Sequence, residues 1–460
     1  MAQEEKSPQF QAGAATSNIT PPLGKPIIGS FSPFPSKHVH DELLVRCLVL
    51  DDGQVQLALV VCDLLGIHRV VSDEARRLIQ ERLAIPTERV LICTTHTHSA
   101  SSALGVDRFT DAPEPDDYQR FVATRIADAV QSATNNLRPA QLAFATAEAP
   151  EHLSNRRWSL KEGTMPPNPF GGIDKVKMNP GAGSPNLLEP AGPTDPTISI
   201  LALREPDGKP IAVLSSYSLH YVGGVGPGHI SADYYGMYCR RLERLMQPEP
   251  QDPPVVAIMS NGTSGDVNNI SFRQPRPRRE PYAHMQAVAD DVADKVLQAI
   301  GTAEYRDSVT LAAQYQELPL TWRQPTAEQI VWARKTVAEP AKEPGKVDLS
   351  RFYAKRALRL VDLPAGTSVP LQVFRIGDVC IGTMPCEVFC EIGLEFKERN
   401  PLQPAVLVSL SHGYLGYLPT ARHLDLGGYE TWLGTNLLEP RAAAKMLDAL
   451  LQMAAEMETG

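Results

Sequence analysis

Apolar runs of strand length recur along the chain and alternate with segments whose apolar residues follow helical spacing. The strand-like runs cover residues 43–50, 56–62, 90–94, 198–203, 211–217, 255–259, 371–376 and 405–410. The helical segments cover 72–83, 118–137, 234–246, 284–300, 327–337 and 442–457, and the first has Ser72 as its expected N-cap. Strands that alternate with helices predict an α/β fold with a mixed β-sheet core and flanking helices.

The segments between these elements indicate one large domain. A stretch rich in Gly, Pro and Asn at 160–196 predicts a long functional or mobile loop, and the clusters at 248–254 and 273–281 are too short to separate independent domains. No sequence repeat is visible. We expect a disordered N-terminal segment at 1–11 and a single catalytic domain at 12–460, with a possible subdivision near residue 305.

Charge and hydropathy exclude two classes of function. The 460 residues carry 44 Lys+Arg and 53 Asp+Glu, which argues against nucleic-acid binding because phosphate neutralisation needs a basic face. Four arginines at 273–279 are interleaved with prolines, and we interpret them as a solvated loop. No window approaches the ~20 apolar residues of a transmembrane helix, so no membrane span is expected.

The cysteines and the N-terminus bear on the cellular compartment. Seven scattered cysteines do not suit a disulfide scaffold, and buried packing is preferred for Cys386 and Cys390 over a shared metal. The first eight residues are polar and lack the apolar core of a signal peptide. We interpret the chain as a mature secreted or periplasmic protein whose leader was removed, although a cytosolic start would look much the same.

Histidines follow two of the apolar runs. The strand at 90–95 leads into His96 and His98, which project from the same face of an extended backbone, so both imidazoles can converge on a zinc or similar divalent ion. His220 ends a second strand, at 211–219, ahead of a glycine-rich loop. His229 lies nine residues later, as either a substrate contact or an exposed loop residue.

Polar groups also follow three later strands. The segment 261–269 is dense in Asn, Gly, Ser and Asp, and is either a tight turn or a backbone cradle for substrate. Glu387 offers a carboxylate after the strand at 379–383, and Tyr414 and Tyr417 offer phenols after the strand at 405–410.

Taken in order, these segments resemble the neutral/alkaline non-lysosomal ceramidase family, in its N-terminal catalytic domain. The resemblance extends from about residue 12 to about residue 440. Its most specific parts are the Thr-His-Thr-His-Ser motif at 95–99 and the Gly-Asp-Val motif at 265–267. Further matching segments lie at 18–22, 61–64, 154–156, 195–197, 385–387, 414–417 and 429–430, together with Gly29 and His220.

The resemblance implies a ceramidase-like zinc hydrolase domain with one zinc ion per chain, or another divalent transition metal. Its ligands would be His96, His220, Glu387 and one phenol of the Tyr414/Tyr417 pair, with Tyr417 favoured. His98 would bind the substrate oxyanion or move a proton. The implied catalytic residues are His98, Tyr417 and Asn268, and the implied substrate-binding residues are Asn155, Arg156, Ser264, Asp266 and His229.

Three features depart from the family pattern. Asn268 stands where the family has its catalytic serine, and Ser264 is a poor substitute because it lies on the other side of Gly265. We also expect no C-terminal immunoglobulin-like module and no amphipathic membrane-docking segment. Since an amide is not an acyl-accepting nucleophile, metal-activated water should attack directly, without a covalent acyl-enzyme.

These features predict a zinc-dependent hydrolase that cleaves an amide or related bond in a small-molecule, glycan or lipid-derived substrate. Ceramide itself is not established as that substrate. Two alternatives stay open. One is a metal-dependent carbohydrate-active enzyme, either a glycoside hydrolase or a lyase. The other is a binding protein that has lost its catalytic activity.

Overall fold

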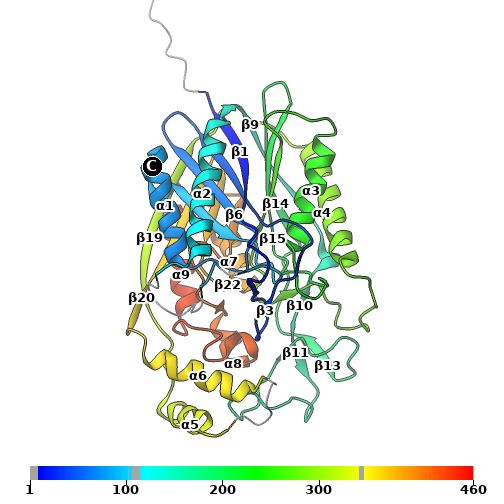
Figure 1. Ribbon diagram of the computed structural model, residues 1–460, viewed down its shortest axis with the longest axis vertical. Coiled ribbons are helices and arrows are strands. Elements are labelled where there is room, and N and C mark those ends of the chain that lie inside the picture. Colours follow the sequence, from blue (N-terminus) through cyan, green and yellow to red (C-terminus); the bar gives the residue numbers. More distant parts are fainter. Residues whose placement is uncertain (1–8, 102, 106–113, 341–346, 459–460) are drawn as a thin grey trace, which may run out of the picture.

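Three large sheets of the same topology form the centre of the structure, a computed structural model that describes residues 9–101, 103–105, 114–340 and 347–458 (Figure 1). Each sheet has the strand order fourth–third–second–first. The first three strands pair antiparallel, and the fourth lies parallel to the third. The same unit therefore occurs three times, although no repeat is visible in the sequence, because a pattern of apolar positions is enough to form it.

The bounds of the three units follow chain order. The first has β1 (Gln11–Asn18), β5 (Leu44–Asp51), β6 (Gln56–Cys62), α1 (Arg69–Leu83), β7 (Val90–Thr94) and α2 (Asp117–Asn135), with β8 (Arg138–Pro139) at its edge. The second has β9 (Gln141–Glu148), β14 (Thr197–Arg204), β15 (Pro210–Tyr217), α3 (Asp233–Met246), β17 (Val256–Asn261) and α4 (Ala283–Gly301). The third has β19 (Leu311–Thr321), β20 (Gly366–Ile376), β21 (Val379–Thr383), α7 (Cys390–Arg399), β23 (Ala405–Val408) and α9 (Ala442–Glu458).

One central apolar core joins the three sheets. Alternate residues of each strand contribute to it, as Leu57, Leu59 and Val61 do in β6. The intervening residues of β6 face a second core that includes residues of α1 and α2. The other two sheets likewise pack their outer faces against α3 with α4 and against α7 with α9. Both faces of strands such as β6, β7, β15 and β17 are thus buried, which is why these strands read as continuous apolar runs.

Connections between the first and second strands of each unit gather at one end of the molecule, the lower end in Figure 1. They carry β2 (Pro26–Ile27), β3 (Phe34–Pro35) and β4 (His38–Val39) in the first unit; η2 (Pro150–His152), β10 (Ser154–Asn155), β11 (Arg157–Leu160), β12 (Lys177–Met178) and β13 (Leu187–Pro190) in the second; and α5 (Ala327–Ala338) and α6 (Leu349–Val361) in the third. The topology places all three connections at the edge where the parallel strands end.

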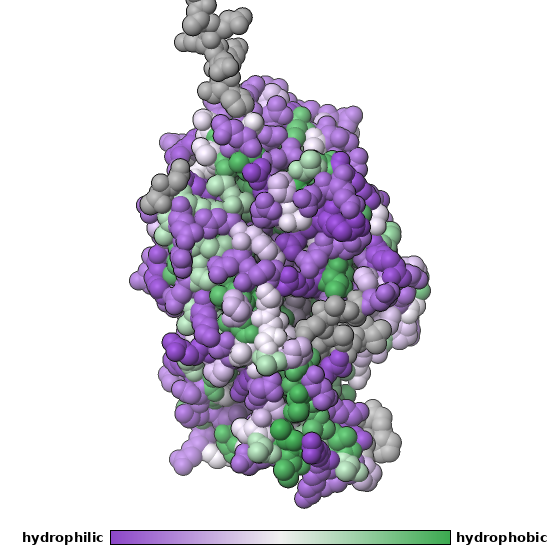
Figure 2. Space-filling view, turned by 90° about the vertical axis from the view of Figure 1, so that its left-hand side faces the viewer, coloured by the Kyte–Doolittle hydropathy of each residue, from purple (hydrophilic) through white to green (hydrophobic). Residues whose placement is uncertain are grey.

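Short elements complete the fold. They are η1 (Thr87–Arg89), β16 (His229–Ile230), β18 (Val267–Asn268), β22 (Glu387–Val388), β24 (Tyr417–Leu418), α8 (Ala421–Leu426) and η3 (Tyr429–Thr431). β16 pairs with β4, β18 with β10, and β22 with β24. On the face seen in Figure 2, hydrophilic residues predominate and hydrophobic residues gather toward the lower end.

The α/β fold expected from the sequence is confirmed, and the eight apolar runs all contain strands. The expected N-cap is wrong, because α1 begins at Arg69 with His68 as its cap, and the Ser72 hydroxyl instead donates to the carbonyl of His412 at 2.7 Å. The ordered domain begins before residue 12, because Phe10 is buried and β1 begins at Gln11, while residues 1–8 lie outside the described part. Residue 305 falls between α4 and β19, at the junction of the second and third units.

Candidate functional site

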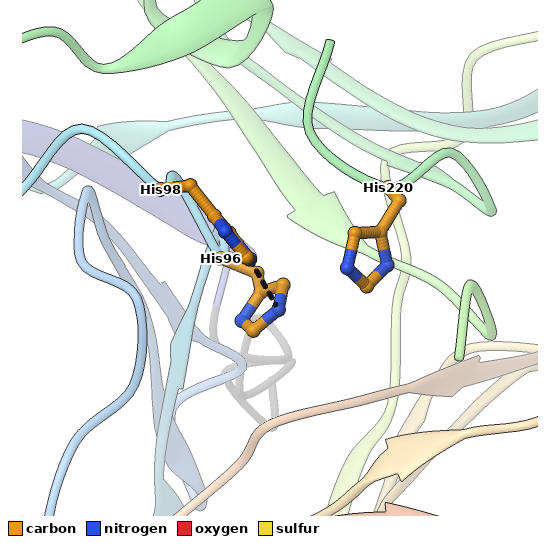
Figure 3. Close-up of side chains that lie close together, drawn as sticks. All are labelled: His96, His98 and His220. Carbon is orange, nitrogen blue, oxygen red and sulfur yellow. Dashed lines mark hydrogen bonds between the residues drawn. The ribbon is translucent and has the colours of Figure 1, made fainter. Parts of the chain in front are cut away.

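One polar residue from each of the three units lies at the same site. His96 follows β7, His220 follows β15, and Glu387 follows β21, so each comes from the carboxyl end of a strand. His96 has a positive φ of 74°, which turns the chain sharply as it leaves β7. All three side chains are buried. Figure 3 shows His96 and His98 on one segment, with His220 facing them from across the site.

A backbone carbonyl determines the tautomer of each histidine. The Nδ1 atoms of His96, His98 and His220 lie 2.6, 2.8 and 3.0 Å from the carbonyl oxygens of Leu65, Gly29 and Ser264. A carbonyl only accepts, so each Nδ1 carries the proton and each neutral imidazole presents a bare Nε2. The Nε2 atoms of His96 and His98 are 3.1 Å apart.

Glu387 adds a further acceptor to this group. Its Oε2 lies 3.2 Å from Nε2 of His96 and 3.7 Å from Nε2 of His220, yet it accepts no hydrogen bond from the described residues. Its Oε1 accepts a 2.6 Å hydrogen bond from the Tyr414 hydroxyl. Lone pairs that converge in this way, without a proton between them, fit a bound cation.

His98 lies beside these ligand atoms and is held on two sides. Its ring stacks on Tyr221, with centroids 3.7 Å apart and planes 15° apart. At the backbone of the same residue, a Cβ at residue 29 would overlap the carbonyl oxygen and Cβ of His98, so only glycine allows this close approach. Burial, and then the neighbouring His96, lower the pKa of His98 well below its ordinary value, which keeps the imidazole neutral and able to accept a proton.

A buried ion-pair cluster holds Arg156 at the same site. Glu430 accepts from Nε of Arg156 at 2.8 Å and from Nη1 of Arg157 at 2.6 Å. The Arg156 guanidinium then lies over the Tyr417 ring, 5.2 Å from its centroid, and its Nη1 is 3.4 Å from Nε2 of His220. Burial raises the pKa of Tyr417 well above its ordinary value, even though Arg156 opposes the shift.

A cavity of about 380 Å³ opens from this cluster. His96, His98, Glu387, Tyr414 and Tyr417 line one part of it. Phe31, Phe352, Arg356 and Tyr429 line another, and come from the first connection, α6 and η3. Aromatic and aliphatic side chains thus face an internal space next to the polar cluster, as in sites for small amphiphilic molecules.

The structure brings seven of the expected site residues together: His96, His98, Arg156, His220, Glu387, Tyr414 and Tyr417. Ser264 is adjacent, but its carbonyl contacts His220 while its hydroxyl donates to Asn261 at 2.8 Å. Asn268 is partly buried, and its Nδ2 donates to Asn179 at 3.0 Å.

Three residues expected to bind substrate make polar contacts within the chain. Asn155 donates to Asp266 at 2.8 Å and to the carbonyl of Pro193 at 3.2 Å, and it accepts from the Arg157 backbone. The other carboxylate oxygen of Asp266 accepts from the Cys390 backbone at 2.9 Å. These contacts position the segment that carries Arg156. His229 does not line the cavity; it contacts the Tyr282 hydroxyl at 2.5 Å and the His38 ring.

Sequence reasoning missed five residues of the site. Tyr221, next to His220, and Glu430, within a matching segment, could have been identified by their neighbours. Phe31, Phe352 and Arg356 carry no local signal, because they lie in irregular connections or on an unpredicted helix.

Other predictions concern the rest of the chain. The four arginines at 273–279 are exposed, as expected for a solvated loop, and all seven cysteines are buried and unpaired.

Glu151, His152 and Asp291 form a second group with metal-ligand geometry, but Lys295 already contacts both carboxylates. Within the described ranges, no helix combines the length and apolar character needed to cross a membrane.

Comparison with known proteins agrees with this fold. Two solved structures resemble the chain over 98% of its length. The first is the neutral ceramidase from Pseudomonas aeruginosa, with a TM-score of 0.69, 17% identity and 74% of that chain covered. The second is a ceramidase complexed with C2, with a TM-score of 0.72, 15% identity and 75% of that chain covered. Among curated proteins none is significantly similar. Residues 10–274 match the family model for the N-terminal part of neutral/alkaline non-lysosomal ceramidases. Since that match spans more than half of the chain, the protein belongs to the neutral/alkaline non-lysosomal ceramidase family.

Proposed function

We propose that this protein is a zinc-dependent hydrolase that cleaves an amide bond in a lipid-derived substrate. The observation that carries the proposal is the convergence of bare imidazole nitrogens on an unsatisfied oxygen of Glu387. Such a set of nitrogen and oxygen donors suits zinc, although other divalent transition metals bind similar sets. The aromatic and aliphatic lining of the cavity favours an acyl chain over a glycan.

His96, His220 and Glu387 would hold the metal, with Tyr417 as a fourth ligand. Tyr417 is favoured because the Tyr414 hydroxyl already donates to Glu387 and so positions that carboxylate. When bound, the ion would polarise a carbonyl oxygen and make water acidic enough to act as a nucleophile near neutral pH. One ion per chain is expected.

The residues around the metal would carry the proton transfers. Water attacks the carbonyl carbon, the carbon–nitrogen bond breaks, and Nε2 of His98 passes a proton from the water to the leaving amine. Arg156, close to His220, would orient the carbonyl group, and Asn268 would hydrogen-bond a polar group of the substrate. Because residue 268 is not serine, no acyl-enzyme is expected.

Product analysis in H2(18)O tests the reaction class. Metal-loaded protein is incubated with N-acyl lipids, N-acyl sugars and oligosaccharides. We expect one labelled oxygen in the carboxylate released from N-acyl lipids. His98→Ala should lower kcat about 10²–10⁴-fold with the metal retained. His229→Ala, outside the cavity, serves as the control.

Three results would contradict the proposal in different ways. Cleavage without label would indicate a lyase, and cleavage of glycosidic bonds alone would indicate a glycoside hydrolase. Substrate binding without cleavage of any compound, unchanged in His98→Ala, would indicate a binding protein. A secreted or periplasmic location stays a prediction, tested by fractionating cells of the source organism.

A further inference from the structure

His220, a candidate metal ligand, extends from an irregular segment rather than from a strand (Figure 3). β15 ends at Tyr217, so the main chain from 218 to 223 lies outside the ladder of that sheet. Buried main-chain groups outside a ladder need other hydrogen-bond partners, and these partners then determine where the segment lies. Side chains of the neighbouring helix α3 are among them.

Two tyrosines of α3 donate to the carbonyl group just before His220. The hydroxyl oxygens of Tyr234 and Tyr235 lie 3.1 and 3.0 Å from the carbonyl oxygen of Leu219. Both side chains are fully buried, and their ring centroids are 4.1 Å apart. A carbonyl oxygen has two lone pairs, so it can accept from both hydroxyls at once. The two tyrosines thus hold the main chain on the amino side of His220.

Asp233, the first residue of α3, holds the main chain on the other side of His220. Its two carboxylate oxygens accept from the backbone N–H groups of Val222 and Gly223 at 2.8 and 2.9 Å. Asp233 is fully buried and has a φ of 56°, in the left-handed region where residues other than glycine are uncommon. Strained residues of this kind cluster at functional sites. Three consecutive side chains of α3 therefore bracket His220.

The turn before α3 also contacts the segment that carries the other candidate histidine ligand. The carbonyl of Ser231 accepts from the Thr97 hydroxyl at 2.7 Å, and the Ser231 N–H donates to the carbonyl of Ser99 at 2.9 Å. Thr97 directly follows His96. One continuous segment, 231–235, is thus bonded to both parts of the chain that supply imidazoles to the candidate metal site.

We propose that the first turn of α3, Asp233 to Tyr235, positions His220 for metal binding, so that these side chains raise the affinity for zinc without contacting the ion. The inference rests on the zinc site of the proposed function. A ligand that is held in its bound orientation loses less conformational freedom when the metal binds. Groups that orient metal ligands contribute about 10–100-fold to metal affinity. Asp233, Tyr234 and Tyr235 are therefore positioning residues.

The zinc dissociation constant, measured by competition with a chelator, tests the proposal. Tyr234→Phe and Tyr235→Phe each leave one hydroxyl on the Leu219 carbonyl, so each alone should change the constant only slightly. The double variant keeps both rings but leaves that carbonyl without either hydroxyl, and should raise the constant about 10–100-fold. Asp233→Asn keeps one acceptor oxygen instead of two and should also weaken zinc binding.

Tyr238→Phe is the matched control on the same helix. Tyr238 is fully buried, and its hydroxyl lies 2.7 Å from Oγ of Ser215, in β15 rather than in the segment 218–223. The control should lower the urea midpoint of metal-free protein, as the other substitutions do, but leave zinc affinity unchanged. An unchanged zinc dissociation constant in the folded double variant, or an equal rise in Tyr238→Phe, would overturn the inference. If the double variant does not fold, Asp233→Asn decides in the same way.

Turnover of N-acyl lipids separates this inference from the proposed reaction. If the unaltered protein cleaves them but zinc affinity is the same in the double variant, hydrolysis stands and the positioning role is wrong. If it cleaves none but the double variant binds zinc more weakly than Tyr238→Phe, the positioning role stands and the proposed reaction is wrong. An unaltered protein that binds no zinc would contradict both.

Discussion

At the residue scale, the candidate metal site depends on which nitrogen of each histidine is bare. Carbonyls of Leu65, Gly29 and Ser264 orient the three imidazoles through Nδ1, and Tyr414 orients Glu387 in the same way. Contacts of this kind fix ligand geometry in metalloproteins. The candidate metal site therefore includes atoms of the main chain that no residue motif describes.

Removing a ligand should remove the metal. His96→Ala and His220→Ala should each contain far less than one zinc ion per chain by elemental analysis, whereas His229→Ala should retain it. Tyr414→Phe keeps the ligands but releases Glu387, so we expect its zinc affinity to fall about 10–100-fold. Full occupancy in both histidine variants would rule out the assignment.

The residues at 264 and 268 should have unequal effects on turnover. The Ser264 contact with the proton on His220 is mainly through its carbonyl, so Ser264→Ala should keep substantial kcat. Asn268→Ala should raise KM, because the proposed polar contact to substrate would be lost. Mass spectrometry of protein quenched during turnover should find no acylated side chain. An adduct on Ser264, or complete loss of activity in Ser264→Ala with zinc still bound, would contradict direct attack by water.

At the scale of elements, the connection that carries Arg156 is attached to η3 through Glu430. The Glu430 carboxylate is fully buried between Arg156 and Arg157. Such a pair is weak evidence for net stability, but removing one member leaves uncompensated charge in the interior.

Glu430→Gln should therefore destabilise the fold and disturb the site. We expect the free energy of unfolding in urea to fall by about 3–5 kcal/mol, the usual cost of breaking a buried ion pair. Glu391→Gln is the matched control, because its ion pair with Arg422 is partly exposed and should contribute less than about 1 kcal/mol. A loss of similar size in both variants would show that burial of Glu430 has no special effect.

At the scale of the whole molecule, histidines buried outside the site should make stability depend on pH. Burial, aided by nearby arginines, lowers the pKa of His412 well below its ordinary value and that of His423 to about 3. Below the unfolded pKa of about 6.5, the unfolded chain binds these protons and the folded chain does not. Stability should thus fall as the pH drops from about 6.5, by about 1.4 kcal/mol per pH unit for each such histidine.

Urea unfolding of metal-free protein at several pH values between 7 and 5 measures this slope. His423→Gln should reduce the slope by the contribution of one histidine. Burial also raises the pKa of Asp266 to about 6, which acts in the opposite direction between pH 4 and 6 and should flatten the lower end of the curve. A slope that does not change in His423→Gln would contradict the assignment.

Local pattern predicted much of the architecture and part of the site. Strands of the three sheets with continuous apolar runs were identified, while β1, β9 and β19 were missed because alanine, glutamine and threonine interrupt their apolar character. His96, His98 and His220 were identified because each follows such a run. Asn155 and Asp266 were assigned to substrate because matching motifs do not reveal whether a polar atom is already bonded within the protein.

The sequence by itself determined the α/β class, the strand ends that carry histidine, and the family motifs, because periodicity and motif spacing are local properties. The resemblance already implied that His96, His220 and Glu387 lie together, and the tertiary structure decided how they meet: they follow strands of three different sheets and converge through packing around a common core. It also decided that Phe31, Phe352 and Arg356 share a cavity. Such contacts depend on how distant segments pack, and no local pattern of apolar residues encodes them.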